Sequence, residues 1–388
     1  MGTTKPASRL AQRFQFRYRY HLHVPGLVYL LLVVLVGLAA ANRPNNLLVW
    51  VFAAMLTGVL LSGVVSGFML MRLHVQRSVP RTARAGEALA VRYQLVNSSR
   101  VWPIFALFVR EMSAGVRIAR AFVQHVGPGE QLVAETVLVP QRRGLLQLDR
   151  FRAETVFPFG LVLKSVRFEQ PADVLVLPRT HILKSGALAN LTAGGLSGSA
   201  TSRRAGPGAD FLSVREYRPG DSLRHVSWRR SATTGDLAVV ERSVDVPPRI
   251  HVVLDLRRAT SALRLAGDAR AAEEQAIELT ASLLAQADHE AYEMRLTVLG
   301  FDSPSMPLRR GHWHLHKMLA QLASLDLDMP RNTQDLLRAD RERMATLVVH
   351  VDRADLAVGG ENAVHLTASQ LPSLVAVHAR PGSMEAQP

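Results

Sequence analysis

Hydrophobic positions follow three different patterns along this chain, and the first is two long runs without charge. Val24–Ala41 has 18 residues and Leu47–Met71 has 25. A helix rises about 1.5 Å per residue, so the runs reach roughly 27 and 37 Å, enough for a hydrocarbon core of about 30 Å. Because only residues 42–46 separate them, the sequence predicts a tight transmembrane hairpin. A cleaved signal peptide is disfavoured, because a second run follows at once and a long arginine-bearing segment precedes the first.

The second pattern is a series of short runs between residues 75 and 178 in which apolar and polar residues alternate. Ala88–Val96 and Gln131–Val139 are two such runs, and Leu145–Arg152 and Leu161–Phe168 follow. Residues that favour turns separate them. Short strands at this spacing predict a small β-sandwich. It carries no catalytic constellation, so we expect a structural or interaction module.

The third pattern begins near residue 248, where strands and helices alternate. Ile250–Asp255 is an apolar run that ends in a carboxylate, as buried parallel strands often do, and residues 268–287 repeat apolar positions with a helical period. Further strands are predicted at Met294–Leu299, Thr346–Val351 and Leu374–His378, and a further helix at Trp313–Leu325. This alternation predicts a doubly wound α/β sheet covered by helices on both faces.

Together the patterns predict a membrane-anchored α+β multidomain protein. Its parts are a basic N-terminus at 1–23, the hairpin at 24–71, the β-sandwich-like domain at 75–178, a connecting segment at 179–247 and the α/β domain at 248–388. The connecting segment includes a stretch rich in glycine and serine. It lacks the Gly-Lys-[Ser/Thr] ending of a phosphate-binding loop, so a nucleotide site is disfavoured.

Composition places the charge at one end of the chain. The 388 residues include 46 Lys and Arg against 32 Asp and Glu, for a net charge of +14, and no cysteine. The lack of cysteine excludes disulfides and thiolate metal sites. Residues 1–100 hold twelve basic residues against one acid, so eleven of the fourteen net positive charges lie there.

These charges flank the two apolar runs on their outer sides, whereas the connection between the runs has Arg43 alone. By the positive-inside rule, we expect a multi-pass protein of the bacterial cytoplasmic (inner) membrane with both termini in the cytoplasm. Arginines in this setting contact anionic lipid headgroups more often than a nucleic-acid backbone. Membrane lipid is therefore the expected partner of this end, and nucleic acid is not.

The second apolar run also carries a stripe of small residues, namely Gly58, Ser62 and Ser66, with Gly63 and Gly67 beside it. Small residues four positions apart let helix backbones approach closely. The stripe predicts packing of the second run on the first or, alternatively, a homo-oligomer.

The densest motif lies between the two soluble parts, at residues 210–232. Pro219-Gly220 favours a type II turn, with Asp221 placed to cap a helix that runs toward Arg230. Trp228 would then lie on the same side of that helix and bury against a neighbouring domain.

Alternating charges in the same motif predict a network that locks the loop, and its members are Arg215, Glu216, Arg218, Asp221 and Arg224. A surface on which an acidic partner docks is the second interpretation, and a catalytic site is the third. Asp221, His225 and Ser227 supply the residue types of a catalytic triad, but they lie too close together in one predicted helix to reach its geometry.

The motif resembles the signature of the domain-of-unknown-function 58 family. The matching positions are Arg204, Gly206, Gly208, Phe211, Arg215, Glu216, Tyr217, Gly220, Asp221, Arg224 and Trp228. Upstream, Phe157–Leu161 and Val174–Arg179 are also similar to the β-domain of that family. The resemblance implies a membrane-anchored bacterial protein with a C-terminal domain similar to von Willebrand factor type A. Such proteins are often encoded beside MoxR-type AAA+ ATPases and are suspected of helping to assemble or activate other complexes. The resemblance implies no reaction.

A von Willebrand A-type domain binds Mg²⁺ through an Asp-x-Ser-x-Ser loop at the C-terminal edge of its sheet. Here the corresponding strand keeps Asp255, but Arg257 and Ala259 occupy the two serine positions. A guanidinium at Arg257 would repel a dication and pair with Asp255. We therefore expect a degenerate loop without metal or another cofactor, with Asp352 as a further acid on the same edge.

Three histidines, His312, His314 and His316, have the residue type of zinc ligands. In a helix only the first and the last share a face, and no carboxylate lies within a turn of them in the sequence. Positions on the surface or at the start of a helix are therefore favoured.

The sequence thus favours a non-enzymatic scaffold or adaptor at the cytoplasmic membrane face, with a MoxR-type AAA+ ATPase as the partner that the resemblance implies. The alternative is an enzyme of cell-envelope metabolism whose site surrounds Asp255, Arg257 and Asp352 at the strand ends.

Overall fold

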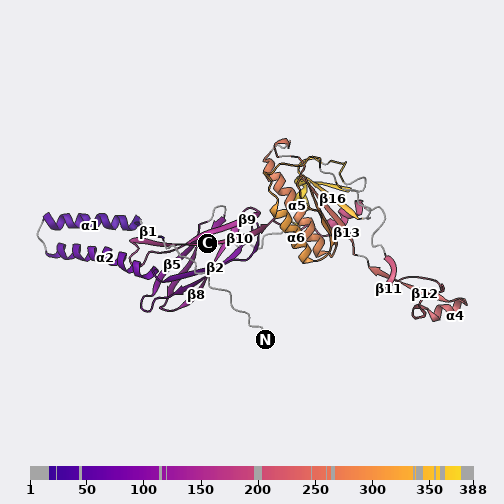
Figure 1. Cartoon of the computed structure of the whole chain (residues 1–388), viewed down its shortest axis with the longest axis horizontal. Coiled ribbons are helices and arrows are strands. Elements are labelled where there is room, and N and C mark those ends of the chain that lie inside the picture. Colours follow the sequence, from indigo (N-terminus) through magenta and orange to yellow (C-terminus); the bar gives the residue numbers. More distant parts are fainter. Residues whose placement is uncertain are drawn as a thin grey trace, which may run out of the picture. The chain divides into compact units, whose positions relative to one another are not determined.

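The computed structural model of the chain describes residues 17–22, 24–42, 46–112, 116–118, 120–195, 203–245, 247–258, 260–263, 267–334, 337, 344–353, 355–358 and 363–376. Most of the basic N-terminus, Arg43 and much of the glycine- and serine-rich stretch lie outside these residues. The chain forms two compact units, Met1–Leu177 and Pro178–Pro388 (Figure 1).

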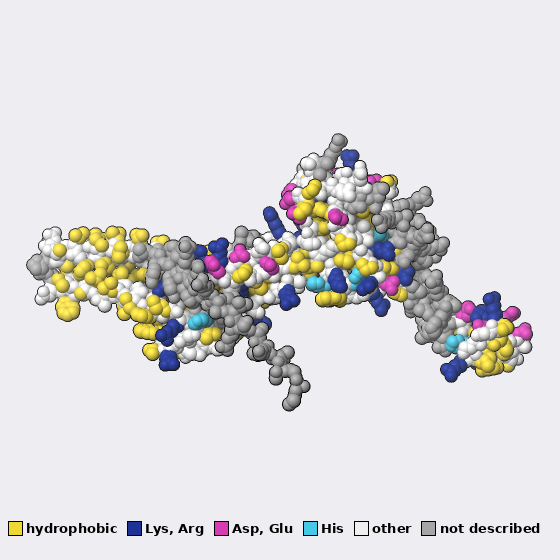
Figure 2. Space-filling model, in the orientation of Figure 1, with side chains coloured by type: hydrophobic (Ala, Val, Ile, Leu, Met, Phe, Trp, Pro, Cys, Tyr) yellow, Lys and Arg dark blue, Asp and Glu magenta, His cyan; other side chains and the backbone are white. Residues whose placement is uncertain are grey.

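The first unit contains two helices that lie side by side, α1 (Val24–Asn42) and α2 (Asn46–Leu70). The Tyr29 hydroxyl donates to the Met55 carbonyl at 3.3 Å, and Gly58 leaves room for that hydroxyl. In the apolar 18-residue stretch of each helix, only 11% of α1 and 6% of α2 is buried. The core helix of a soluble protein would be mostly buried. Both helices are long and apolar enough to cross a membrane, and Figure 2 shows their hydrophobic side chains on the surface.

Two β-sheets follow and enclose a common core. One has the order β2-β4-β8-β6 and the other β1-β10-β9-β5-β7, with β3 beside β10. The strands are β1 (Arg17–Leu22), β2 (Leu73–Ser78), β3 (Thr82–Arg84), β4 (Leu89–Asn97), β5 (Ile104–Glu111), β6 (Val116–Ile118), β7 (Ala121–Val126), β8 (Gln131–Pro140), β9 (Gly144–Thr155) and β10 (Val162–Leu177). Burial alternates residue by residue along β4 because successive side chains point to opposite faces. Buried side chains of both sheets, among them Val91 and Phe151, form one cluster.

A buried ion pair crosses this core. The side chains of Arg77 in β2 and Glu111 in β5 are 1% and 0% exposed, and Arg77 Nη1 lies 2.8 Å from each oxygen of the carboxylate. Tyr93 of β4 donates to the same carboxylate at 2.7 Å. Because both charges are hydrogen-bonded, the pair is tolerated in the core and ties the two sheets together.

The segments on both sides of the hairpin belong to this β-domain. α2 ends at Leu70 and β2 begins at Leu73. Before α1, β1 pairs antiparallel with β10, and its last residue, Leu22, lies opposite Val162. The chain that enters the hairpin and the chain that leaves it are therefore held by one domain.

The second unit is built on a five-stranded sheet with the order β15-β14-β13-β16-β17. The strands are β13 (Arg249–Asp255), β14 (Glu293–Leu299), β15 (Met306–Arg309), β16 (Ala345–His350) and β17 (Ala363–Thr367). All neighbours are parallel except β15 against β14. The carboxyl ends of the parallel strands therefore meet at one edge of the sheet.

Three helices of this unit share one face of the sheet. α5 (Ala269–His289) contacts both α3 (Ala187–Gly195) and α6 (His312–Ser324), and its central turns are buried because they also pack on β13, β14 and β16. The sequence predicted helices on both faces. Among the described residues, Leu337 and Val358 pack against Val253 and Val348 of the sheet, and most of the chain around them lies outside the described part.

The described residues of one predicted strand, 374–376, do not form a strand. Leu371–Leu374 forms the short helix α7, which has a proline in its first turn, and Val375 makes only an isolated bridge to Leu183. Pro372 lies in the first turn of that helix, where proline is favoured, so Leu374, the first residue of the predicted strand Leu374–His378, ends a helix instead. The fifth strand is β17, where His365 and Thr367 interrupt the apolar pattern. Residues 377 and 378 of the predicted strand lie outside the described residues.

Candidate functional site

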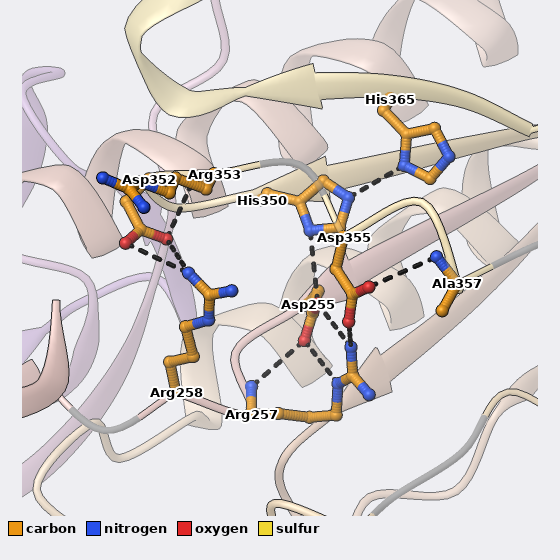
Figure 3. Close-up of polar contacts among 9 residues, drawn as sticks. All are labelled: Asp255, Arg257, Arg258, His350, Asp352, Arg353, Asp355, Ala357 and His365. Carbon is orange, nitrogen blue, oxygen red and sulfur yellow. Dashed lines mark hydrogen bonds and ion pairs between the residues drawn. The ribbon is translucent and has the colours of Figure 1, made fainter. Parts of the chain in front are cut away.

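Charged side chains converge at the carboxyl edge of the five-stranded sheet (Figure 3). β13 ends at Asp255, and His350 of β16 lies directly opposite it in the parallel register. The loops that follow these strands bring Arg257 and Asp355 to the same place. Asp255, Arg257, His350, Asp355 and His365 are termed the edge cluster.

Arg257 fills the space between two carboxylates. Its Nε donates to Asp255 Oδ1 at 2.9 Å, and its Nη2 donates to Asp255 Oδ2 at 3.0 Å and to Asp355 Oδ2 at 2.8 Å. The side chains of Arg257 and Asp255 are 15% and 10% exposed, so this pair is largely removed from water. The pairing of Arg257 with Asp255 that the sequence predicted is present in the structure.

Asp255 is held in its charged form. Burial acts to raise the pKa of Asp255, but hydrogen bonds from His350 and Arg257 outweigh it and keep this pKa well below its usual range. The hydrogen bond to Asp255 is the main cause that raises the pKa of Arg257 above its ordinary value. Both oxygens of Asp255 accept from donors of this chain, which makes the group a poor general base and a poor metal ligand.

Two histidines extend the edge cluster away from Asp255. His350 Nδ1 lies 3.2 Å from Asp255 Oδ2, and His350 Nε2 lies 3.0 Å from His365 Nδ1. The two ring nitrogens of His350 therefore lie within hydrogen-bonding distance of Asp255 on one side and of His365 on the other. Burial, and then the neighbouring His350, lower the pKa of His365 below its ordinary value.

A second ion pair lies beside the edge cluster. Arg258 Nη1 donates to the two oxygens of Asp352 at 3.1 and 3.3 Å, and both residues line a shallow hollow with Asp255 and His350. The sequence placed Asp255, Arg257 and Asp352 on one edge, and the structure brings them there.

Sequence reasoning missed His350, His365, Asp355 and Arg258 as members of this site. The one signal was the position of His350 at the carboxyl end of a predicted strand. Asp355 follows that strand in an irregular segment, and β17, which carries His365, was not predicted.

The signature motif forms a two-stranded sheet of its own, termed the arm. β11 (Arg203–Glu216) pairs antiparallel with β12 (Ala238–Asp245), and α4 (Trp228–Thr234) lies between them. The sequence did not predict this hairpin, because glycine and proline at residues 206–208 break the strand pattern. The structure accommodates them as an irregularity in the register between Ala205 and Asp210.

A tight turn begins the tip of the arm. Gly220 has a φ of +108°, and the Asp221 amide donates to the Arg218 carbonyl at 3.0 Å. This is the reversal predicted at Pro219-Gly220, since proline presets its own φ and glycine accepts the positive value at the next position.

Arg215 is the centre of a lock across the arm. Its guanidinium donates to the two Asp221 oxygens at 2.6 and 2.8 Å and to Glu241 of β12 at 2.7 Å. The Ser213 hydroxyl donates to the other Glu241 oxygen at 2.7 Å. Hydrogen bonds from Arg215, and then from the Arg218 amide, lower the pKa of Asp221 to about 2.

The lock has fewer members from the motif than the sequence predicted. Glu216 and the side chains of Arg218 and Arg224 are exposed, and Glu241 from the opposite strand takes part instead. Tyr217 is half-buried, and its amide donates to the Leu237 carbonyl at 2.8 Å. The backbone of four more motif residues lies in β11, and their side chains are outside the described part: Arg204, Gly206, Gly208 and Phe211.

Two expectations for the motif are wrong. Asp221 does not cap a helix, because Arg215 and the Arg218 amide already occupy its carboxylate and α4 begins only at Trp228. The chain is still extended at Ser222, which prevents a continuous helix from Asp221. Trp228 is 63% exposed, so the burial that the sequence predicted is not present within its own unit.

His312 and His314 of α6 point in different directions. The side chain of His312 is 80% exposed at the start of the helix, whereas His314 is buried and its Nε2 lies 3.3 Å from the Met294 carbonyl. Among the residues that the structure describes, no group of three or more His, Cys, Asp or Glu side chains is arranged to hold a metal ion.

Comparisons with known proteins identify one family. Residues 213–359 match the family model described as "Protein of unknown function DUF58". The "Uncharacterized protein YeaD" of Bacillus subtilis (strain 168) is 24% identical over 289 residues, which cover 72% of this chain and 69% of that protein.

Two solved structures illustrate the likenesses found by shape. The CARDB domain of a Pyrococcus furiosus protein is 19% identical to this chain. The match covers 27% of this chain and 87% of the CARDB domain chain, with a TM-score of 0.19. The GH20 exo-β-N-acetylglucosaminidase of Vibrio harveyi is 10% identical and covers 72% of this chain and 57% of its own, with a TM-score of 0.16. At these TM-scores neither likeness carries an argument.

Proposed function

This chain is a member of the DUF58 family through residues 213–359, and we propose that it is a non-enzymatic adaptor held by its hairpin on the cytoplasmic face of a bacterial membrane. A partner protein docks on the tip of the arm. The family resemblance suggests a MoxR-type AAA+ ATPase as that partner. Together they would assemble or activate complexes of the envelope or other complexes.

The observation that carries this proposal is the composition of the arm tip. Leu223, Trp228 and Leu237 are 59%, 63% and 41% exposed. Arg224 and Arg229 are exposed beside them. Tryptophan and arginine are the residues most enriched at binding hot spots, and an exposed apolar group with a polar rim is typical of a contact surface.

The tip is also organised before any partner binds. The Arg215 lock and the turn at Gly220 hold the segment that leads to Trp228 in one conformation. Docking on a fixed surface loses less conformational entropy than docking on a loose loop. The surplus of arginine favours a partner with an acidic surface.

The edge cluster supports an adaptor over an envelope enzyme. Such an enzyme would use Asp255 at the strand ends, and both oxygens of this acid are already bonded to Arg257 and His350. Parallel strands on both sides of β13, with an acid at its end, support the von Willebrand A-like interpretation of this unit. In that interpretation, Arg257 takes the role of the missing cation.

Two features support the membrane arrangement. The exposed apolar surfaces of α1 and α2 would be costly in water and are favourable in lipid. β1, before the hairpin, pairs with β10, after it, so both flanks lie on the same side of any membrane that the hairpin crosses. The arginine excess on these flanks favours the cytoplasmic side.

Crosslinking from the arm tip tests the proposal. A photoreactive amino acid at Leu223 of the full-length protein, irradiated in its native membranes with and without ATP, should capture a AAA+ ATPase. Trp228→Ala should weaken docking by about thirtyfold, the cost of losing one hot-spot residue of about 2 kcal/mol. Trp313→Ala is the matched control, since Trp313 is 73% exposed on α6 and lies outside the tip. Capture of no AAA+ protein in either nucleotide state would contradict the proposal.

A further inference from the structure

We infer that one end of the β-domain lies in the headgroup layer of the membrane and binds lipid through two apolar loops. The loops are residues 98–103, between β4 and β5, and residues 156–161, between β9 and β10. They are termed the interfacial loops. The inference rests on the membrane anchoring proposed above and adds to it a lipid-binding surface outside the two helices.

Strand register brings both loops to the end where the hairpin joins the domain. Leu73, the first residue of β2 after α2, lies opposite Asn97, the last residue of β4, so the loop after Asn97 is at that end. In the other sheet, Leu107 near the start of β5 lies opposite Thr155, the last residue of β9. The loop after Thr155 is therefore at the same end.

Both interfacial loops expose large apolar side chains, although loops in water are usually polar. Val101, Trp102 and Phe159 are 72%, 42% and 55% exposed. The Trp102 ring stacks on Phe68 of α2 with 6.0 Å between the ring centres and 13° between the planes. The apolar surface of α2 thus continues onto the first loop. Figure 2 shows hydrophobic side chains on the hairpin and on the end of the β-domain that adjoins it.

The second loop is packed just as closely against α1. A Cβ atom added to Gly26, in the first turn of α1, would collide with the backbone of Leu161. Only glycine allows this approach, so the loop that carries Phe159 is fixed beside the start of the first helix. The two loops therefore flank the hairpin from both of its helices.

Helix length sets the depth of these side chains. α2 has 25 residues, so at about 1.5 Å per residue it reaches roughly 37 Å, longer than a hydrocarbon core of about 30 Å. Its last turn, which includes Phe68, therefore falls at the headgroup level. Trp102 stacks on that turn and sits at the depth where tryptophan is enriched in membrane proteins.

Hydrogen bonds hold the first loop in the presenting conformation. Buried Asn97 donates through Nδ2 to the Trp102 carbonyl at 2.9 Å, and the Trp102 amide donates to Ser99 Oγ at 2.8 Å. The Ser99 amide donates to Asn97 Oδ1 at 3.0 Å. These hydrogen bonds fix the backbone that carries the Trp102 side chain.

Charge at this end suits an anionic headgroup layer. Arg72, after α2, and Arg100, in the first loop, are exposed. Glu130 is the exposed acid of the third loop at this end, and its carboxylate accepts a hydrogen bond from the Gly127 amide. If α1 and α2 span the bilayer, its headgroup layer lies next to the interfacial loops. Exposed arginine and tryptophan at this place therefore favour lipid over a soluble protein as the ligand.

Single-tryptophan versions of the full chain test the inference in nanodiscs of phosphatidylcholine with a minority of phosphatidylglycerol. The sequence has 4 tryptophans. Trp50, Trp228 and Trp313 are 75%, 63% and 73% exposed, so their replacement by phenylalanine should leave the fold intact. With Trp102 alone, lipids brominated near the headgroup should quench fluorescence more strongly than lipids brominated near the bilayer centre. Aqueous acrylamide should quench it weakly.

A second version that keeps only Trp50, in α2, separates this inference from the anchoring on which it rests. Quenching of Trp50 by brominated lipid together with none of Trp102 would overturn the lipid-binding loops and leave the anchored adaptor standing. The absence of quenching at both positions would overturn both proposals.

A matched pair of variants tests whether the loops themselves bind lipid. In the chain that keeps Trp102 alone, Val101→Ser combined with Phe159→Ser should reduce the quenching by headgroup-brominated lipid severalfold. Leu145→Ser is the control, because Leu145 is 60% exposed but lies opposite Leu175 at the far end of the domain. Equal effects of the two changes would contradict the inference.

Discussion

Replacement of Arg257 by alanine should destabilise the second unit, because it leaves two acids of the edge cluster facing one another. Arg257 makes two side-chain hydrogen bonds to Asp255, at 2.9 and 3.0 Å, and one to Asp355 at 2.8 Å. The side chain of Asp255 is 10% exposed and that of Asp355 is 38% exposed. Water therefore replaces the guanidinium at Asp355 but not at Asp255.

The expected cost follows from these contacts. A hydrogen bond to a charged group contributes about 1.5–3 kcal/mol, and removing one partner of a buried ion pair costs about 3–5 kcal/mol. His350 still donates to Asp255 in the variant, and Asp355 is hydrated. We therefore expect a loss of about 3 kcal/mol, at the lower end of the range for a broken buried pair.

Hydrogen exchange of the detergent-solubilised full-length protein in increasing urea should measure this loss at β13 and β16. Arg249→Ala is the matched control at the opposite end of β13, since Arg249 and its partner Glu293 are 40% and 27% exposed and such a pair contributes under about 1 kcal/mol. The double change Asp255→Asn with Arg257→Ala should recover part of the loss by removing the uncompensated charge. A cost of Arg257→Ala no larger than that of Arg249→Ala would refute the reasoning.

The same pair of residues decides the metal question. Titration of the unchanged protein with Mg²⁺ should give no saturable heat, because Arg257 occupies the carboxylate that a cation needs. In Arg257→Ala, two carboxylates remain without a cation, and Mg²⁺ should restore stability by mass action. Saturable binding to the unchanged protein that Asp255→Ala abolishes would contradict this account.

Two remaining predictions concern pH. The pKa of Asp221 is lowered to about 2, mainly by the hydrogen bond from Arg215. Because the pKa of Asp221 is lower in the folded arm than in the unfolded chain, its contribution to stability is complete above about pH 4 and is lost as pH falls toward 2. The fluorescence of Trp228 in a single-tryptophan chain should therefore report release of the arm tip over that interval. Asp221→Asn should show the released state already at neutral pH, and an unchanged acid transition in this variant would argue against the lock. The pKa of His251 is lowered to about 4, first by burial and then by Arg295. The second unit should therefore lose on the order of 3 kcal/mol as pH falls from about 6.5 to 4, and His251→Gln should flatten this dependence in denaturant titrations.

Elements with a short-range period were predictable from the sequence. β8 begins at Gln131 and β13 ends at Asp255, both as predicted, because alternation and apolar runs reflect only the immediate faces of a strand. Asp255 and Arg257 were predictable as a pair since they are two residues apart. His350 was not, because it bonds to Asp255 across 95 residues of chain and only the strand order brings them together.

The arm shows a different limit. Its strands contain glycine and proline at a register irregularity, and its lock depends on Glu241, which lies 26 residues from Arg215. The composition of the motif therefore indicated a charge network but not its members. Whether Trp228 is buried depends on what packs against α4, and no local pattern encodes that.

The edge cluster and the arm lock differ in a way that bears on control of the proposed adaptor. A cation that is part of the chain cannot dissociate, so Arg257 keeps the edge cluster in one state. Its ion pair with Asp255 is sheltered, with side chains 15% and 10% exposed. In the arm, the side chains of Arg215 and Asp221 are 33% and 20% exposed, so an acid from a partner can compete for Arg215 with a smaller desolvation cost. An acidic partner would therefore replace the ion pair between Arg215 and Asp221 without changing the edge cluster. The turn at Gly220 would be the first part of the chain to change conformation.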